Sequence, residues 1–471
     1  MKKLTILCMM LSILVGLMCP VAAVEEDISV LSGCHSLKAN MPLAGQEQLL
    51  PSADGVILYE LNTKTLVYAF EPDDRVNPSS MVKILAALVA LEKGDLNDVV
   101  TVQRSTLDSV PIGSVSAGLL RDEQVPMLDL IYCCLVASAN DATAVMAEHI
   151  AGSQDAFVEM MNQKAKELGC SDSFFSNVNG LNDNMQYSTA RDLAIITAAA
   201  LENKTFEQIF CTKNYTMPAT NLSGERSILT TNYMMSDEKV KGYLDGRVLG
   251  GKTAAATHTK RSLICTAEIG TARYLSVVMS ADSVMSEDNI SVISFGSFKE
   301  TAQLLDHAQT NYEVRQILEA SQAFSQLKVA GGMNDVTLAP MKDVFSVLPI
   351  NCDPATLEFL PEFNMGAIEA PVAAGQKIGA IRVSCNGIVL TRCPLAAMFA
   401  VERENTVILP AAPISPDEMD KTVSHFIMWA LIGVGGLFLL VAIVLLSRRL
   451  VHNARIRHLY RKRKRNRRRS R

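Results

Sequence analysis

The chain has 471 residues, 49% of them hydrophobic, and a formal net charge of −5 at pH 7. That length leaves room for two or three domains of about 150 residues each. The net charge hides an asymmetry, because the segment after residue 446 carries 13 Lys or Arg and no acid. Without that segment, Lys2 and Lys3, 29 basic residues stand against 49 acidic ones, a net charge of −20. The acidic body argues against a nucleic-acid-binding role.

The N-terminus has the order of a secretory signal peptide. Lys2 and Lys3 precede an apolar run, which ends in the small residues of Val21-Ala22-Ala23. Residues 1–23 are therefore the predicted signal peptide, with cleavage after Ala23. The residues before Cys19 do not suit a lipoprotein processing site, so no lipid anchor is expected. Residues 24–49 have little periodic pattern and are interpreted as a leader.

A second apolar segment, residues 426–446, has 21 residues and no charge. At ~1.5 Å per residue it can cross a hydrocarbon core of about 30 Å. The basic tail that follows, residues 447–471, is typical of a stop-transfer sequence on the cytoplasmic side. We therefore expect a single-pass cell-membrane protein with residues 24–425 outside and the tail inside. Anionic lipid headgroups are the nearest partner for the tail, ahead of nucleic acid.

The eleven cysteines do not indicate a disulfide scaffold. Two lie in the signal peptide, and the nine that remain show no zinc-type spacing. Several, such as Cys133 and Cys134, lie in apolar runs where a thiol packs as a small hydrophobic group. The odd number leaves at least one free thiol.

Residues 50–312 have the pattern of an α+β domain. Residues 55–72 predict two strands joined by a turn near residues 62–64. Apolar periodicity predicts helices over 127–151, 154–169, 189–204 and 299–312. Residues 252–269 and 273–281 are expected to be adjacent antiparallel strands. Strands at both ends with helices between them predict an antiparallel sheet flanked by helices.

Residues 313–405 change to short strands separated by Pro, Gly and Asn, which predicts a second, smaller all-β domain. Asn386-Gly387 is a strong type I′ hairpin signal between two alternating runs. Residues 406–425 then form a Pro-rich linker to the membrane segment. The register places Cys393 several residues along the ladder from Cys385, too far for a disulfide between them. The predicted pairs are Cys385–Ile388, Val383–Leu390 and Ala380–Cys393.

The stretch NPSSMVKILAALVAL, residues 77–91, places a lysine in the first turn of an otherwise apolar helix. Pro78 and a capping Ser79 or Ser80 predict the helix start. Lys83 is unfavourable at such depth unless another group pairs with it. Ser80 and Lys83 are three residues apart and so share a helix face, which makes them a candidate nucleophile and base. The alternative is a capping serine and a lysine that reaches solvent.

Two further motifs favour the catalytic interpretation. Residues 136–143, VASANDAT, contain Ser138 and Asn140 at a break between helical runs. Residues 248–257, VLGGKTAAAT, contain Lys252 and Thr253 at the start of a strand. Alone, each is a common capping turn or an exposed edge-strand pair. Together, in this order in an exported chain, S-x-x-K, S-x-N and K-T are typical of penicillin-binding proteins and class A β-lactamases.

On these motifs the chain resembles the serine D-alanyl-D-alanine carboxypeptidases, the low-molecular-mass penicillin-binding proteins. The resemblance covers roughly residues 50–405 and includes the segments 55–84, 174–196 and 370–395. It implies a penicillin-binding-protein/β-lactamase-like transpeptidase domain followed by the all-β domain. It also implies removal of the terminal D-alanine from peptidoglycan stem pentapeptides, with β-lactams as covalent inhibitors. No cofactor or metal is expected.

The resemblance assigns Ser80 as the nucleophile that attacks the penultimate D-alanine carbonyl. Lys83 would be its base, uncharged because burial and the neighbouring Lys252 lower its pKa. The N–H groups of Ser80 and Ala255 would form the oxyanion hole at the helix N-terminus. An acyl-enzyme would form on the serine, and water would hydrolyse it.

The remaining roles concern the leaving group and the substrate. Ser138 would relay a proton to the departing D-alanine amine, and Asn140 would hold the substrate's amide carbonyl. Lys252, with Thr253, would bind the terminal carboxylate. Ala254 stands where the family usually has glycine, and one methyl group is expected to leave activity in place. The membrane span is a second departure, since the family commonly has an amphipathic anchor.

Two alternatives remain open at this level. A class A β-lactamase shares the three motifs but uses a glutamate four residues before an asparagine for deacylation. No Glu-x-x-x-Asn occurs between Asn140 and Lys252, and the β domain and membrane segment do not suit such an enzyme. A non-catalytic cell-wall scaffold is supported only by Ala254.

Overall fold

The computed structural model describes residues 49, 51–181, 183–287, 291–363 and 368–404. The predicted signal peptide, linker, membrane helix at 426–446 and basic tail lie outside these residues, as does the leader apart from Leu49. Within the described part of the chain, no helix is both long enough and apolar enough to cross a membrane.

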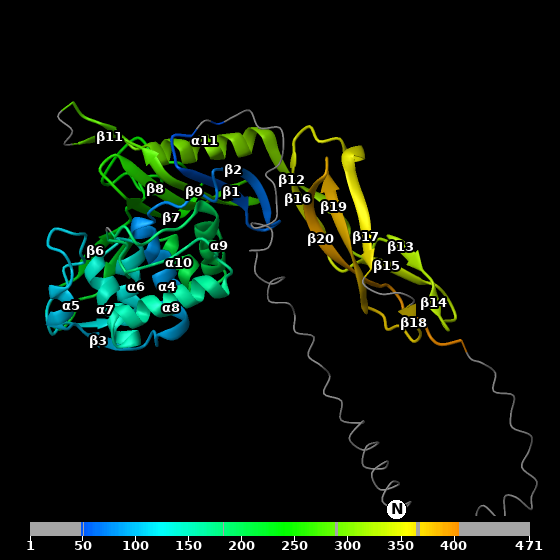
Figure 1. Ribbon diagram of the computed structural model, residues 1–471, viewed down its shortest axis with the longest axis horizontal. Helices are drawn as coiled ribbons and strands as arrows, with labels where there is room; N and C mark the ends of the chain where they lie inside the picture. Colours follow the sequence, from blue (N-terminus) through cyan, green and yellow to red (C-terminus); the bar gives the residue numbers. More distant parts are fainter. Residues whose placement is uncertain (1–48, 50, 182, 288–290, 364–367, 405–471) are drawn as a thin grey trace, which may run out of the picture. The chain divides into compact units, whose positions relative to one another are not determined.

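The first region is built on a five-stranded antiparallel sheet (Figure 1). Its strands are β1 Gly55–Glu60, β2 Thr65–Phe70, β7 Val248–Ala255, β8 Lys260–Ile269 and β9 Ala272–Asp282, in the order β2-β1-β9-β8-β7. The hairpin β1–β2, from the start of the region, therefore lies in one sheet with β7, β8 and β9 from its end, because β1 pairs with β9. This arrangement confirms the predicted α+β class.

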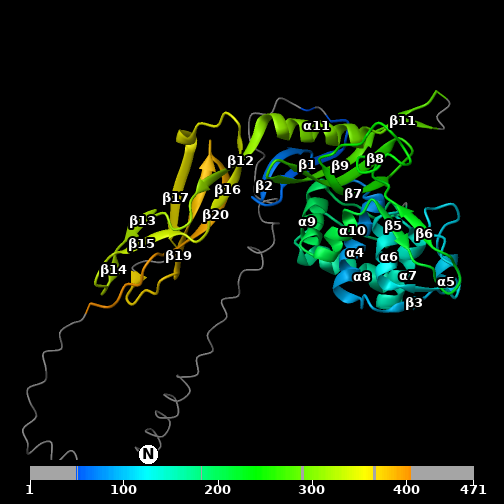
Figure 2. The same cartoon turned by 180° about the vertical axis from the view of Figure 1, so that it is seen from behind.

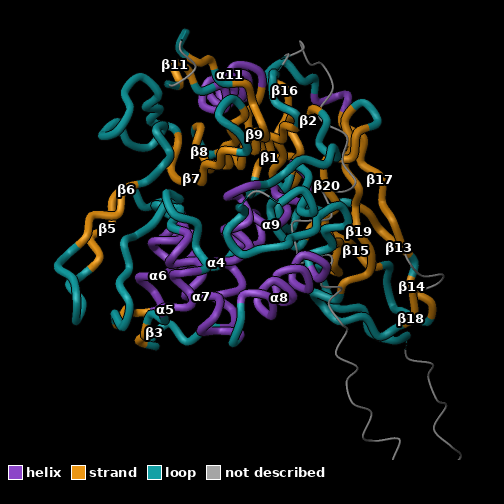
Figure 3. Tube along the Cα trace, turned by 60° about the vertical axis from the view of Figure 1, so that its left-hand side comes forward, coloured by secondary structure: helices purple, strands orange, loops and turns teal. Residues whose placement is uncertain are grey.

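Helices form a layer on one face of the sheet, and one further helix covers the other face (Figures 1 and 2). The helix layer contacts the sheet through α9 and α10, whereas α11 packs on β8 and β9. Figure 3 shows the sheet from the side, between α11 and the layer of the other helices. The helices are α4 Val82–Lys93, α5 Arg104–Asp108, α6 Met127–Leu135, α7 Asn140–Ala151, α8 Gln154–Glu167, α9 Ala190–Leu201, α10 Lys204–Phe210 and α11 Gly296–Asn311.

Side-chain alternation explains how the sheet serves two cores. In β1, Ile57 and Tyr59 belong to the core on the helix side, while Val56 and Leu58 belong to the core on the opposite face. The central helix α4 is apolar nearly all round, and its residues 82–90 are all buried among α6, α7, α8, α9 and α10. A helix with this composition is stable only inside a core.

The predicted helical stretch 127–151 consists of two helices, because residues 136–139 leave the helical path between α6 and α7. The predicted strand 252–269 is also two strands, β7 and β8, separated by a turn at residues 256–259. Short strand pairs complete this region: β3 Val99–Thr101 with β4 Gln124–Pro126, β5 Asn214–Met217 with β6 Arg226–Leu229, and β10 Val284–Met285 with β11 Val292–Ser294.

From Tyr312 to the last described residues, the regular structure is all β apart from the short turn η2 Pro354–Thr356, which confirms the all-β prediction. The main sheet has the order β13-β15-β20-β19-β17, and β12–β16 and β14–β18 form separate pairs. The strands are β12 Tyr312–Leu318, β13 Ser325–Leu327, β14 Val329–Ala330, β15 Val336–Pro340, β16 Val344–Pro349, β17 Leu357–Phe363, β18 Ile368–Glu369, β19 Lys377–Cys385 and β20 Ile388–Ala397.

The hairpin turn lies at Asn386-Gly387, and Cys385 faces Ile388 as predicted. The next predicted pairs are wrong, because a register shift between Val383 and Ser384 adds one residue to β20. The observed pairs are Val383–Thr391 and Ile381–Cys393. Cys385 and Cys393 are both free thiols, and the sulfur that lies near Cys385 belongs to Cys352, 3.7 Å away.

Candidate active site

Ser80 lies in η1, the 3-10 turn Ser79–Met81 that leads into α4. No serine side chain caps this helix, so the predicted capping role is wrong. Instead, Ser79 Oγ donates to Ala255 O on β7 at 2.9 Å, and Ser79 N donates to Asn77 Oδ1 at 2.8 Å. Ser79 has φ +48°, which non-glycine residues adopt rarely. These bonds hold the turn against β7 with Ser80 half-buried between helix and sheet.

The side chain of Lys83 is fully buried and does not reach solvent. Its Nζ donates to Asn140 Oδ1 at 2.8 Å and to Asn179 O at 2.6 Å, and it lies 3.4 Å from Ser80 Oγ. Burial lowers the pKa of Lys83 to about 8. A neutral amine has two N–H donors and one lone pair. Because two carbonyl oxygens take the donors, the lone pair is left for the Ser80 hydroxyl.

Lys252 is the second fully buried lysine, on β7. Its Nζ donates to Ser138 Oγ at 2.8 Å and to Thr253 O at 2.8 Å. Burial first, and then the charge on Lys83, lower the pKa of Lys252 well below its ordinary value. Burial is thus the first cause for both lysines. The charge effect between the two cations lowers the pKa of Lys252 only, and the expected lowering of the Lys83 pKa by Lys252 is not found. The two amines can lie in the same buried site because the lowered pKa values make their neutral forms accessible.

Ser138 lies in the connection between α6 and α7, and Asn140 is the first residue of α7. Ser138 has φ +64°, an unfavourable conformation for a residue with a Cβ. The two residues that follow Ser138 are held by backbone hydrogen bonds. Ala139 N donates to Cys133 O at 3.0 Å, and Asn140 N donates to Val115 O at 2.8 Å. This strained connection brings the Ser138 hydroxyl to Lys252 and the Asn140 amide to Lys83.

The residues after Lys252 also take defined positions. Thr253 Oγ1 donates to Thr231 Oγ1 at 2.6 Å. Ala254 is buried in the core on the helix side of the sheet. Its methyl group therefore fills core space, and the expectation that it leaves activity in place stays a prediction.

Sequence reasoning missed Asn179, whose backbone oxygen is an acceptor for Lys83. Only its place in the segment that resembles the family could have drawn attention to it. Its side-chain Oδ1 is buried without a hydrogen-bond partner. Asn179 also lines an open cleft of about 620 Å³, together with Ser109, Pro111, Gln154, Asn177, Leu181, Asp183 and Asn184. Among the described residues, no group of His, Cys, Asp or Glu is arranged to hold a metal ion.

Comparison with known proteins places this site in a family. Residues 44–283 match the D-alanyl-D-alanine carboxypeptidase family, and residues 312–403 match the C-terminal domain of penicillin-binding protein 5. The D-alanyl-D-alanine carboxypeptidase DacF of Bacillus subtilis is 28% identical over 355 residues, 74% of this chain and 86% of that protein. DacA of Haemophilus influenzae is also 28% identical over 355 residues, 74% of this chain and 84% of that protein.

Solved structures give the same result. Penicillin binding protein 5 from Haemophilus influenzae aligns with a TM-score of 0.62 and 28% identity, over 76% of this chain and 100% of that one. Penicillin binding protein 6B from Escherichia coli aligns with a TM-score of 0.57 and 25% identity, over 76% and 99%. The first family match spans half of the sequence, and the three motifs meet within its bounds. The chain therefore belongs to the D-alanyl-D-alanine carboxypeptidase family of serine hydrolases.

Proposed function

We propose that the protein removes the terminal D-alanine from peptidoglycan stem pentapeptides through an acyl-enzyme on Ser80. The observation that carries the proposal is the hydrogen bonding of Lys83. Two carbonyl oxygens, on Asn140 and Asn179, orient the amine, and Ser80 Oγ lies 3.4 Å from its Nζ. A pKa of about 8 leaves a usable fraction of Lys83 neutral near neutral pH.

In the proposed acylation step, Ser80 Oγ attacks the carbonyl carbon between the two D-alanines and gives its proton to Lys83. The backbone N–H groups of Ser80 and Ala255 stabilise the negative charge on the carbonyl oxygen. As the C–N bond breaks, Ser138 gives its proton to the departing amine and takes in exchange the proton that Lys83 received from Ser80. Water then attacks the ester, which releases the shortened peptide and restores the serine hydroxyl.

Lys252, Thr253 and Asn140 are the proposed substrate-binding groups. A carboxylate placed beside Lys252 favours the charged form of the amine and so raises its lowered pKa. Substrate binding would therefore restore the cation that holds the terminal carboxylate. Asn140 Oδ1 is occupied by Lys83, which leaves its Nδ2 to donate to the amide carbonyl of the substrate.

Intact-mass spectrometry after incubation with penicillin tests this function and its alternatives. A stable adduct on wild-type protein that is absent from Ser80→Ala, together with D-alanine release from a peptide ending in D-Ala-D-Ala, is the expected result. A short-lived adduct with rapid penicillin turnover would indicate a β-lactamase instead. Wild-type protein that neither forms an adduct nor releases D-alanine would indicate a scaffold.

The proposed location is the outer face of a cell membrane, with residues 426–446 as a single span and residues 447–471 on anionic lipid in the cytoplasm. Support comes from the apolar length and the 13 basic residues of the tail. Protease added to intact cells should digest the body and spare the span and tail. Antibody access from outside to an epitope placed after Arg471 would contradict this orientation.

A further inference from the structure

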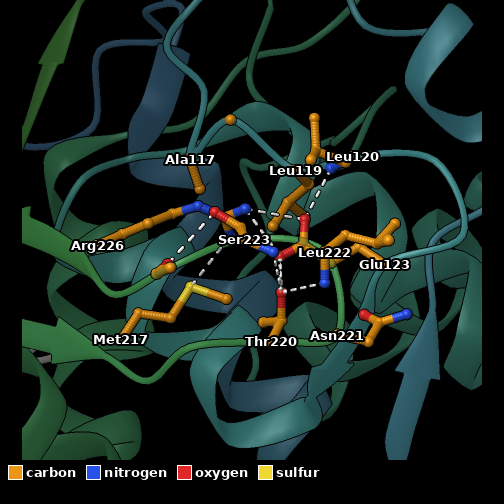
Figure 4. Close-up of polar contacts among 12 residues, drawn as sticks. Ala117, Leu119, Leu120, Glu123, Met217, Thr220, Asn221, Leu222, Ser223 and Arg226 are labelled. Atoms are coloured by element: carbon orange, nitrogen blue, oxygen red, sulfur yellow. Dashed lines mark hydrogen bonds and ion pairs between the residues drawn. The ribbon is translucent and has the colours of Figure 1, made fainter.

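Glu123, on the loop before β4, is a fully buried carboxylate outside the predicted catalytic set. Arg226 Nη2 donates to both of its oxygens, at 2.7 and 2.9 Å. Thr220 Oγ1 donates to Oε1 at 2.6 Å, and Leu120 N donates to Oε2 at 2.8 Å. These contacts are drawn in Figure 4. Such full pairing is the condition under which a carboxylate is stable without solvent.

Asn221 makes a second link between the same two segments. Its Oδ1 accepts from Gln124 N at 2.7 Å, and its Nδ2 donates to Asp122 O at 3.1 Å. Together with Glu123, these bonds fasten the β5–β6 connection, residues 218–225, to the loop 115–124. The partners are about a hundred residues apart in sequence, so the link is purely tertiary.

The other end of the loop 115–124 is bonded to the first turn of α7. Asp141 accepts from Ser116 Oγ at 2.6 Å, from Ala117 N at 2.9 Å and from Leu119 N at 3.0 Å. Val115 O accepts from Asn140 N at 2.8 Å. The loop therefore lies between Arg226 at one end and the backbone of Asn140 at the other.

We propose that Glu123 and Arg226 are positioning residues for the reaction at Ser80. They fix the loop 115–124, the loop fixes the backbone of Asn140, and Asn140 Oδ1 orients the Lys83 amine. Removing the charge of Glu123 leaves the partly buried Arg226 guanidinium without its counter-ion, which is unfavourable and loosens the loop. This inference rests on the proposed Ser80 acyl-enzyme.

The test is the pH dependence of Ser80 acylation by a fluorescent penicillin in wild-type protein, Glu123→Gln and Arg226→Lys, far below their unfolding temperatures. We expect Glu123→Gln to lower the acylation rate by about ten- to a hundredfold, because small displacements of a catalytic group have effects of that size. The midpoint of the pH profile should also move to lower pH, since an ammonium that loses a carbonyl acceptor deprotonates more easily. Arg226→Lys keeps a positive charge beside Glu123 and should retain more of the wild-type rate than Glu123→Gln does.

Arg247→Gln is the matched control, because it breaks the ion pairs of another partly buried arginine, with Asp245 before β7 and with Asp306 on α11. It should lower stability and leave both the rate and the midpoint unchanged. A variant that only lowers the stability of the fold would reduce the amount of active protein, but the midpoint of the pH profile of acylation would not change. If Glu123→Gln does not fold, Thr220→Val removes one bond to Glu123 and should show the same direction of shift.

Folded variants that acylate at the wild-type rate with the wild-type midpoint would overturn the positioning role. That outcome differs from failure of the proposed function, in which wild-type protein itself would neither form the penicillin adduct nor release D-alanine.

Discussion

Gly180 packs so closely on the turn before Ser80 that a Cβ at this position would lie 1.9 Å from the carbonyl oxygen of Ser79. Gly180 also has φ +72°, which disfavours any other residue. The turn and the segment after Asn179 therefore fit together only because residue 180 has no side chain. The same segment supplies the Asn179 carbonyl to Lys83.

Gly180→Ala should displace Ser79 and abolish penicillin labelling, because the added methyl group overlaps the backbone of the turn that holds Ser80. Gly152→Ala is the control: its φ is +80°, but nothing lies within 4 Å of the added Cβ. That variant should lose only about 1–2 kcal/mol for the backbone conformation. Labelling rates and thermal unfolding of both variants make the comparison, and equal labelling would contradict the close fit.

Lys83→Arg should lower the acylation rate by at least about 100-fold, which is the usual contribution of a general base. A guanidinium stays protonated in proteins and cannot accept the Ser80 proton. Stopped-flow labelling with a fluorescent penicillin measures the rate, and circular dichroism controls for folding. Substantial turnover by this variant would remove Lys83 from the role of base.

The acylation rate of wild-type protein should rise with pH and level off above about pH 8, because the proposed reactive form of Lys83 is the neutral amine and burial lowers its pKa to about 8. Rates measured across this range with a penicillin that is itself stable there provide the test. A profile that falls with rising pH would mean that the charged amine is the reactive form.

Stability should depend on pH through the same group. The folded-state pKa of Lys83, about 8, lies below the value of about 10.4 expected for an unfolded chain, so between these values the unfolded state binds more protons. The free energy of unfolding should therefore rise as pH increases through this window. Lys83→Met should be more stable than wild type below pH 8, with a gain that shrinks toward pH 10. Urea unfolding at several pH values measures this difference.

Oxidised glutathione should join Cys352 to Cys385, whose sulfurs lie 3.7 Å apart, and not Cys385 to Cys393. Each disulfide formed reduces one molecule of oxidised glutathione to two thiols. Burial raises the pKa of Cys385, so the reaction should accelerate with pH as the thiolate fraction grows. Non-reducing peptide mapping identifies the bond. Cys352→Ser should prevent it and Cys393→Ser should not, and a 385–393 peptide would contradict the observed register.

The sequence was enough to predict the elements whose conformation depends on their own residues and not on distant contacts. The Asn386-Gly387 turn follows from the backbone conformations that Asn and Gly allow, and the buried helix α4 follows from its nearly continuous apolar side chains. The spacing of Ser80 and Lys83 likewise placed the two side chains together before any tertiary contact was known.

Contacts between distant segments decided the rest. The bulge in β20 changes the register beyond Val383, and no local signal marks it. The depth of Lys83, its bond to Asn179 O and the close approach of Gly180 arise when segments about a hundred residues apart pack together. Burial is a property of the whole core, so the sequence by itself determined which groups could react, and only the tertiary structure decided their protonation and orientation.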